Sequence, residues 1–296
     1  MHLGDDVLDR IRTEGYAVVE GFLTADELAA AREGLFDEFP THEQYFAEPE
    51  RYVHVVAHQF AGLRVGPFRS WPLTRLAFHP DLVDAAERFC GTTDLDLYKI
   101  ELWAKYSGAV DYDQAHHRDY GNHHLLVPRA DRRWPQLTTF ILLSDVTEHD
   151  APTKVIPRSI GDDVPLWPDR LAPGELHEHE VAVTGPAGSI FLYTTDVLHR
   201  GSAFTGHPRS RFALLADYMA RGNPWMGKVS WPGAALHPAI RTLMVHATPR
   251  ERHLFGVPLP GHEYWDEQTL HDVALRYPGI DLTPYTSPDT SPDTSP

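Results

Sequence analysis

The chain has 296 residues, of which 42% are hydrophobic and 23% charged, and its formal net charge is −16 at pH 7. These values predict a soluble globular protein with one large domain or two small ones. The negative charge argues against nucleic acid and anionic membranes as partners, because both repel an acidic surface. We expect a cytoplasmic protein, since no apolar run has membrane-spanning length and no signal-peptide pattern opens the sequence.

The cysteine content agrees with a reducing compartment. Cys90 is the only cysteine of the chain, so an internal disulfide is impossible. It lies in the segment AAERFCG, on the apolar side of a predicted helix. We therefore expect a small core residue rather than a nucleophile or a zinc ligand.

The N-terminal third has helical patterns. Helices are predicted over residues 5–15, 24–39 and 72–91. Thr24 and Glu27 have the spacing of a capping box, and Pro40 ends the helix that they begin. Gly15 and Gly91 fit the C-terminal ends of the other two helical segments.

Residues 41–71 show no clear period and are expected to be irregular. They contain many aromatic side chains and histidines, among them Tyr45, Phe60 and Phe68. A segment with so many large rings must bury some of them, because exposed apolar area is unfavourable. The rings either wrap around the core or line a pocket.

From residue 95 onward the pattern changes to strands. Strand patterns cover residues 95–106, 136–146, 179–194 and 209–219, the third with two strands around a Gly/Pro turn. Strands separated by turns, with no helices between them, indicate an antiparallel sandwich or jelly roll. Trp103, in the first of these strands, is expected to be a core residue.

We interpret the chain as one domain over residues 1–285. It comprises N-terminal helices (5–91), a barrel core (about 95–220) and a partly helical C-terminal extension (221–285). Residues 286–296 repeat the motif T-S-P-D without an apolar residue, and we interpret them as a tail.

A cluster of histidines follows the first strand of the barrel, in the segment QAHHRDYGNHH (114–124). Positions i and i+2 of an extended chain point to the same side, so His117 and Asp119 would face one point while His116 and Arg118 face away. The pair is either part of a metal site or a hydrogen-bonded pair in a polar loop.

A metal site needs a third ligand from elsewhere in the chain. His199 is the best candidate, because it follows a strong strand pattern and precedes Gly201 and Ser202. Two histidines and one carboxylate form the facial triad of non-haem iron oxygenases, which leaves coordination positions open. Zinc hydrolysis is the main competing chemistry, but the motif H-E-x-x-H is absent from the sequence.

An arginine downstream of His199 is the second element of the candidate site. A cosubstrate with a distal carboxylate needs a fixed cation, and arginine provides a permanently charged fork. Arg211 opens the last strand pattern and alternates with Ala213 and Leu215, so its side chain is expected to point into the barrel. Arg209 is the alternative on the same face.

The segments QAHHRD, DVLHRGS and RSRFALLADY together resemble the phytanoyl-CoA dioxygenase family of Fe(II)/2-oxoglutarate oxygenases. The segment GYAVVEGFLTADELAAAREGL resembles the family's opening strand and helix. APTKVIPRSI resembles its I-P-x-S turn, and GPAGSIFLYTTDVLH resembles the strand that leads to the distal histidine. The resemblance runs with gaps from about Gly15 to Tyr218.

The resemblance implies a mainly β fold with flanking α-helices, a double-stranded β-helix (jelly roll, cupin-like). It implies three ligands for iron and three further contacts for 2-oxoglutarate, and O2 as the other cosubstrate. The implied iron ligands are His117, Asp119 and His199, and the implied cosubstrate contacts are Arg211, Ser202 and Gln114.

Two departures from the family pattern concern the loops around the site. Arg200 stands between the histidine and the glycine of the family's H-G-S motif, and residues 158–160 read Arg-Ser-Ile where the family has Gly-Ser-His. Neither departure removes an implied ligand. Asp119 separates the chain from related halogenases, which lack this carboxylate.

We expect oxidation of a C–H bond in a small molecule. The aromatic residues in 41–71 and 225–231 favour a partly apolar metabolite, and a natural-product intermediate is a candidate. A CoA thioester would need basic residues for its phosphates, and the only basic cluster contains Arg129, Arg132 and Arg133. The alternatives are a divalent-metal hydrolase or isomerase in a cupin-like barrel, and a non-catalytic binding barrel.

Overall fold

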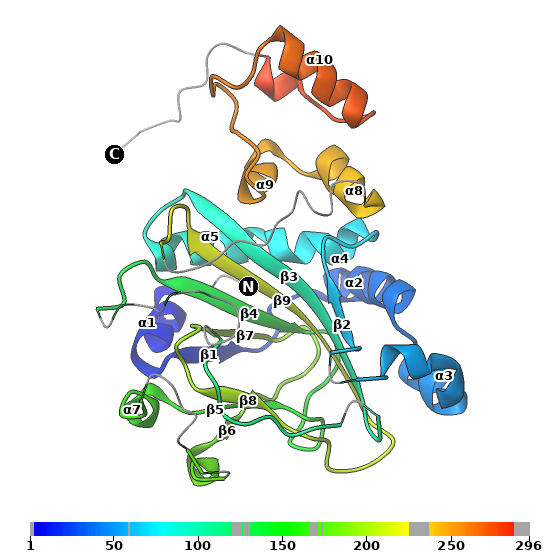
Figure 1. Ribbon diagram of the computed structural model, residues 1–296, viewed down its shortest axis with the longest axis vertical. Helices are drawn as coiled ribbons and strands as arrows, with labels where there is room; N and C mark the ends of the chain where they lie inside the picture. Colours follow the sequence, from blue (N-terminus) through cyan, green and yellow to red (C-terminus); the bar gives the residue numbers. More distant parts are fainter. Residues whose placement is uncertain are drawn as a thin grey trace.

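The computed structural model describes residues 3–58, 60–109, 111–119, 126, 129, 131–165, 171–172, 174–224 and 237–286. Within these residues the strands form two antiparallel sheets, one six-stranded with the order β1-β7-β4-β9-β3-β2 and one three-stranded with the order β6-β5-β8 (Figure 1). The large sheet contains β1 (Tyr16–Val19), β2 (Leu63–Val65), β3 (Leu95–Tyr106), β4 (Gln136–Leu142), β7 (Ile190–Tyr193) and β9 (Ser210–Ala220). The small sheet contains β5 (Thr153–Val155), β6 (Val181–Ala182) and β8 (His199–Gly201).

The two sheets enclose one cavity, which is lined by β3 and β9 on one side and by β5 and β8 on the other. Neighbouring strands are distant in sequence, since β9 lies between β3 and β4 and pairs with both along most of its length. This antiparallel arrangement with covering helices confirms the predicted mainly β, double-stranded β-helix fold.

Helices precede, interrupt and follow the strands in the chain. Those before the barrel are α1 (Asp5–Glu14), α2 (Ala25–Glu38), α3 (His42–Ala47), η1 (Pro49–Val55), α4 (Trp71–Arg75), η2 (Leu76–Phe78) and α5 (Pro80–Cys90). Those within or after it are α7 (Arg158–Gly161), η4 (His177–His179), α8 (Pro238–His246), α9 (Pro249–Leu254), α10 (Glu267–Arg276) and η6 (Thr283–Tyr285). None of the helices in the described part of the chain is long and apolar enough to cross a membrane.

The three predicted helical segments are present. The Thr24 side chain accepts from the backbone N–H of Glu27 while the Glu27 carboxylate accepts from the backbone N–H of Thr24, so the capping box forms. Gly15 and Gly91 end α1 and α5 with φ of 88° and 70°, a left-handed conformation that favours glycine.

The prediction of an irregular segment over 41–71 was wrong, because this segment contains α3, η1, β2 and the start of α4. Thr41 and Gln44 form a second capping box, at the start of α3. The aromatic rings have both expected fates. Tyr45 is buried and stacks on Tyr106 with the ring centroids 4.1 Å apart, whereas Phe60 lines the cavity.

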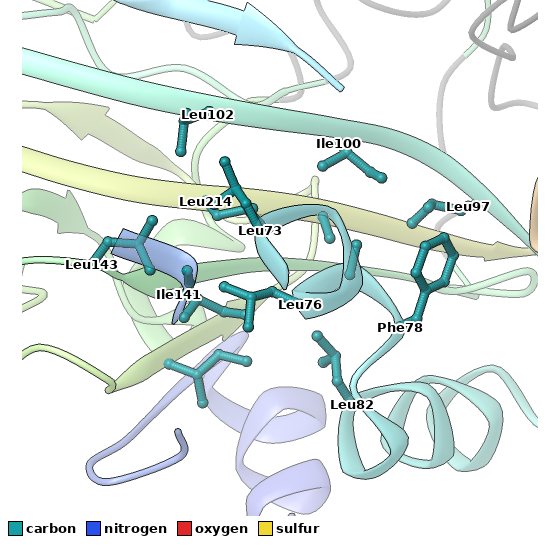
Figure 2. Packing of buried hydrophobic residues seen from close by; sticks show 14 of the residues in the cluster. Leu73, Leu76, Phe78, Leu82, Leu97, Ile100, Leu102, Ile141, Leu143 and Leu214 are labelled. Carbon is teal, nitrogen blue, oxygen red and sulfur yellow. The ribbon is translucent and has the colours of Figure 1, made fainter. Parts of the chain in front are cut away.

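The main hydrophobic core lies on the outer face of the large sheet, where α5 packs against β4 and β9. Ile100, Leu102 and Leu214 are fully buried there, because alternate residues of β3 and β9 point outward. Figure 2 shows the packing of Leu73, Leu76, Phe78 and Leu82 against Leu97, Ile100, Leu102, Ile141, Leu143 and Leu214. Burial of one such side chain stabilises the fold by about 1.5–3 kcal/mol.

The C-terminal helices contact the rest of the molecule through α8, which packs on α4, and α9, which packs on β3. Arg252 of α9 is 2% exposed and donates to the backbone oxygens of Met244 and Asp281. These bonds hold α8, α9 and the segment before η6 together. Residues 225–231, where aromatic residues were expected near the site, and the tail beyond Thr286 lie outside the described residues.

Candidate metal and cosubstrate site

Backbone pairing places the first two candidate ligands opposite each other. The backbone N–H of His117 donates to the oxygen of His199 at 2.9 Å, and the N–H of His199 donates to the oxygen of His117 at 3.0 Å. Residues that exchange both hydrogen bonds in an antiparallel pair present their side chains on the same face. The two imidazole rings are accordingly 4.5 Å apart between centroids.

The third candidate ligand lies two residues beyond His117. The backbone N–H of Asp119 donates to the oxygen of Thr195 at 3.1 Å, which continues the extended pairing. Its Oδ1 lies 3.4 Å from Nε2 of His199 and 3.8 Å from Nε2 of His117. Two imidazole nitrogens and one carboxylate oxygen from distant parts of the chain thus face one point.

The hydrogen bonds of the rings favour the tautomer that binds metals. Nδ1 of His117 lies 3.0 Å from the backbone oxygen of Ala115, and Nδ1 of His199 lies 3.0 Å from that of Val197. A carbonyl oxygen only accepts, so Nδ1 carries a proton in both rings and Nε2 is the nitrogen that can bind a metal. Both Nε2 atoms face Asp119, and the donor set therefore fits an iron facial triad.

A tyrosine orients the carboxylate. The hydroxyl of Tyr193, at the end of β7, donates to Oδ2 of Asp119 at 2.9 Å. This leaves Oδ1 as the oxygen that faces the two histidines. Tyr193 is 1% exposed, and burial together with the negative charge of Asp119 raises its pKa well above the ordinary value. The hydroxyl is therefore a permanent donor to this carboxylate.

Neighbouring charges shift the pKa values of two of the candidate ligands in opposite directions. Burial opposes the ionisation of Asp119, but the positive charges of His199 and Lys99 outweigh it and hold the pKa of Asp119 well below its usual value. Burial likewise opposes a charge on His199, and the carboxylate of Asp119 raises the pKa of this imidazole above its usual value. A metal ion at Nε2 would compete with protonation of this imidazole.

The cavity beside these residues has a volume of about 280 Å³. Polar side chains gather along its wall at Lys99, Glu101, Lys105, Tyr112, Gln114 and Arg211. Apolar side chains lie between and above them at Phe60, Leu63, Trp103, Phe140 and Leu215. The expectation of Trp103 as a core residue was wrong, since it is half-buried and its ring meets that of Phe60 at the cavity wall.

Two cations lie side by side in the cavity. Arg211 faces the cavity and is 8% exposed, and Lys105 on the neighbouring strand pairs with it directly in the β3–β9 register. Burial lowers the pKa of Arg211 to about 10, so it stays charged at neutral pH. Burial and the charge of Arg211 lower the pKa of Lys105 to about 7. Two desolvated cations at one place form a site for an anion.

Lys105 was missed by the sequence reasoning, although a signal was present. The segment KIELWAK (99–105) alternates polar or amphipathic residues with apolar ones, as one inward-facing row requires. The row contains Lys99 and Glu101, whose Nζ and Oε1 lie 3.6 Å apart. Nζ of Lys99 is also 3.6 Å from the buried carboxylate of Asp217 on β9.

The remaining predicted residues take different positions. Gln114 lines the cavity, and its Oε1 accepts from the backbone N–H of Gly201 at 2.7 Å. The hydroxyl of Ser202 donates to the oxygen of Pro152, while its own backbone oxygen accepts from Nζ of Lys105 at 2.8 Å. Arg209, the alternative to Arg211, is bound to Asp150 at 2.7 Å, away from the cavity.

The two arginines that depart from the family motifs, Arg158 and Arg200, form salt bridges outside the cavity. Arg158 binds Asp196 through two nitrogens at 2.8 and 2.9 Å. Arg200 points away from the cavity and binds Glu180 and Asp113. The loops therefore differ from the family pattern in outward contacts and leave the ligand positions intact.

Comparison with known proteins identifies the family. The family model for phytanoyl-CoA dioxygenase (PhyH) matches residues 11–212. A search of curated protein sequences gave no significant match.

Solved structures share the fold at low identity. EctD from S. alaskensis, in its apo form, is 22% identical with a TM-score of 0.54, over 77% of this chain and 82% of that one. The alpha ketoglutarate dependent carbocyclase SnoK from nogalamycin biosynthesis is 19% identical with a TM-score of 0.53, over 77% and 88%. The epimerase SnoN in complex with Fe3+, alpha ketoglutarate and nogalamycin RO is 23% identical with a TM-score of 0.50, over 73% and 83%.

The family match covers more than half of the chain, and the barrel and its donor set agree with it. The chain belongs to the phytanoyl-CoA dioxygenase family and is an Fe(II)- and 2-oxoglutarate-dependent dioxygenase.

Proposed function

We propose that His117, Asp119 and His199 hold Fe(II) and that Arg211 binds the distal carboxylate of 2-oxoglutarate. The observation that carries the proposal is the approach of Oδ1 of Asp119 to the Nε2 atoms of His199 and His117, at 3.4 and 3.8 Å. When bound, iron, 2-oxoglutarate and O2 supply the oxidising chemistry, and the protein supplies position and exclusion of water.

Lys105 extends the proposed cosubstrate site. A dicarboxylate brings two negative charges into the cavity, and Arg211 with Lys105 can neutralise the distal one. Ser202 would act through Lys105, because its backbone oxygen holds the ammonium group. Gln114, whose side chain accepts a hydrogen bond from Gly201 of β8, would contact the cosubstrate from the side of the small sheet.

The rest of the cavity favours a small, partly apolar substrate. Phe60, Leu63 and Trp103 provide an apolar wall, and Glu101 accepts a hydrogen bond from Nε1 of Trp103 at 3.1 Å. Glu101 and Lys99 can bind a polar group of the substrate below that wall. We propose hydroxylation, or another oxidation, of a C–H bond in such a metabolite, for example a natural-product intermediate.

Two of the three arginines of the basic cluster, the part of the chain where a CoA phosphate could bind, already form ion pairs. Arg129 binds Asp131 at 2.7 Å, and Arg132 binds Asp162 at 2.6 Å and Asp196 at 3.2 Å. These pairs favour a free small molecule over a CoA thioester.

The domain limits and the location belong to the same proposal. Residues 1–285 would form one domain, because α8 and α9 pack on α4 and β3 and their buried residues belong to the main hydrophobic core. The only cysteine, Cys90, has its pKa raised to about 12 by burial, which suits a non-reactive thiol in a cytoplasmic protein.

The proposal is tested by the conversion of 2-oxoglutarate to succinate. Protein without a histidine tag is incubated with Fe(II), ascorbate and 2-oxoglutarate, with and without O2, and succinate is measured. We expect succinate that requires both Fe(II) and O2, and its loss in Asp119→Ala. Equal turnover in Asp119→Ala and wild type would exclude the ligand assignment.

A further inference from the structure

A second group of metal-ligating side chains lies on the opposite side of the strand pair that carries the iron ligands. It consists of His116, His177 and Glu180, whose ligand atoms all lie within 4.8 Å of one another. Nε2 of His116 is 3.0 Å from Oε1 of Glu180, and Nε2 of His177 is 3.6 Å from the same oxygen. We refer to these three residues as the outer site.

The outer site follows from the alternation of an extended chain. His117 and Asp119 point into the barrel, so His116 must point out, and His199 points in while Arg200 points out. The turn of η4 brings His177 over this face. The proposed iron site and the outer site are therefore built back to back on the same segments.

The distances from the two histidine nitrogens to Oε1 of Glu180 fit a tetrahedral metal site. With metal–ligand bonds of about 2.0–2.2 Å, neighbouring ligand atoms of a tetrahedral zinc site lie about 3.3–3.5 Å apart. The values of 3.0 and 3.6 Å bracket this range. Nε2 of His116 is buried and, among the described residues, makes no hydrogen bond of acceptable geometry, even to the nearby Glu180. A bound metal ion would satisfy this nitrogen.

Arg200 positions the carboxylate without occupying all of it. Its Nε and one terminal nitrogen donate to Oε1 and Oε2 of Glu180 at 2.6 and 2.9 Å. A carboxylate has about four acceptor positions, so each oxygen keeps one for a further partner. Asp113, at 2.8 Å from Arg200, compensates the charge of the guanidinium and leaves the carboxylate of Glu180 for the metal.

We propose that His116, His177 and Glu180 bind a divalent transition metal, with zinc as the best-fitting ion, at a site separate from the catalytic iron. The fourth position would be taken by water, because His177 is 52% exposed and the site opens to solvent there. The metal would join the segment around His116 to the turn of η4 and stabilise the segment that carries the proposed iron ligands.

Zinc stoichiometry tests the proposal. Untagged, metal-free protein is titrated with Zn²⁺ alone in equilibrium dialysis, and bound metal is measured for wild type and four variants. We expect two zinc ions for wild type and for His179→Ala, and one ion each for His177→Ala and Asp119→Ala. The double variant with both His177→Ala and Asp119→Ala should bind none. His179 is the matched control, because it lies on the same turn and pairs with the exposed Glu178 rather than with Glu180.

A second measurement is independent of the iron site. In the Asp119→Ala background, Zn²⁺ should raise the thermal midpoint, and His177→Ala should remove that rise while His179→Ala keeps it. Two ions bound by His177→Ala, or an Asp119→Ala protein that binds no zinc, would overturn the outer site. A difference of one zinc ion between wild type and Asp119→Ala reports on the proposed iron site and not on the outer site. The iron-ligand assignment and the outer site can therefore fail separately.

Discussion

The two faces of β3 and β9 are both buried but chemically opposite. The outer face carries Ile100, Leu102 and Leu214, which pack against helices. The inner face carries Lys105 and Arg211, together with other charged side chains, around a cavity. A buried charge is costly unless it is paired, so the inner face is not arranged for stability. The comparison indicates that one face of the same strands stabilises the fold while the other provides chemistry.

Removal of a proposed iron ligand should have a greater effect than any other substitution considered. Asp119→Ala should reduce succinate formation at least about 100-fold, beyond the loss seen when only a supporting partner of a metal ligand is removed. The free energy of unfolding should fall only moderately, because Tyr193 and His199 lose a partner but no core contact is lost. Turnover and urea denaturation are measured on the same preparation. A large loss of stability would show that the two faces are not separate.

The outer face should respond in the opposite way. Leu102→Ala should lower the free energy of unfolding by about 2–5 kcal/mol, because it leaves a cavity in the core. Turnover per folded molecule should stay near wild type. Leu275→Ala is the control, since Leu275 is 67% exposed and should change stability by less than about 0.5 kcal/mol.

Removal of the cavity arginine tests the role of the inner face in binding 2-oxoglutarate. Arg211→Met should raise the KM for 2-oxoglutarate about 30- to 100-fold, which corresponds to one charge-assisted interaction of about 2–3 kcal/mol. Stability should be equal or higher, because a buried cation is replaced by an apolar side chain. Arg209→Met, in the salt bridge to Asp150, should leave KM unchanged. The same KM in both variants would contradict the assignment of Arg211.

The tyrosine behind the carboxylate should have a smaller effect. Tyr193→Phe removes the donor to Oδ2 of Asp119 and should weaken metal affinity about tenfold. The affinity is measured by competition with a chelator, without turnover. Tyr16→Phe is a control on the paired strand β1, opposite Tyr193. An affinity equal to wild type would show that the hydroxyl does not position the carboxylate.

The smallest effect concerns pH. The pKa of Lys105 is lowered to about 7, so the side chain is charged below that pH and increasingly neutral above it. Affinity for the 2-oxoglutarate dianion should be full below about pH 7 and fall as pH rises, by at most tenfold per pH unit. Binding is measured anaerobically between pH 6 and 8.5. Lys105→Met should bind more weakly with a flat profile, and an unchanged slope would contradict this role.

Local signals in the sequence predicted much of the fold. The capping box of Thr24 and Glu27, the glycines after α1 and α5, and the period-two patterns of β3 and β9 depend on neighbouring residues only. Thr41 and Gln44 carried the same kind of signal for α3, but that helix has only six residues and no apolar period to support it.

Local geometry was sufficient to predict the direction of several candidate side chains. The spacing of His117 and Asp119 indicated that both point to one side, and the alternation after Arg209 indicated an inward Arg211. The approach of His199 depends on long-range strand pairing. The sequence therefore offered His199 only as a candidate, which the resemblance to a family supported. The roles of Tyr193 and Lys105 could not be read in this way, because each depends on which residue lies opposite on another strand.

Anaerobic titration of the metal-free protein with Fe(II) and 2-oxoglutarate, followed by visible absorption, tests the central assignment most directly. An iron ion that is bound by His117, Asp119 and His199 and chelated by 2-oxoglutarate should give a charge-transfer band. The band should need more 2-oxoglutarate in Arg211→Met and disappear in Asp119→Ala. A band of equal intensity and midpoint in all three proteins would contradict the convergence of these side chains on one iron.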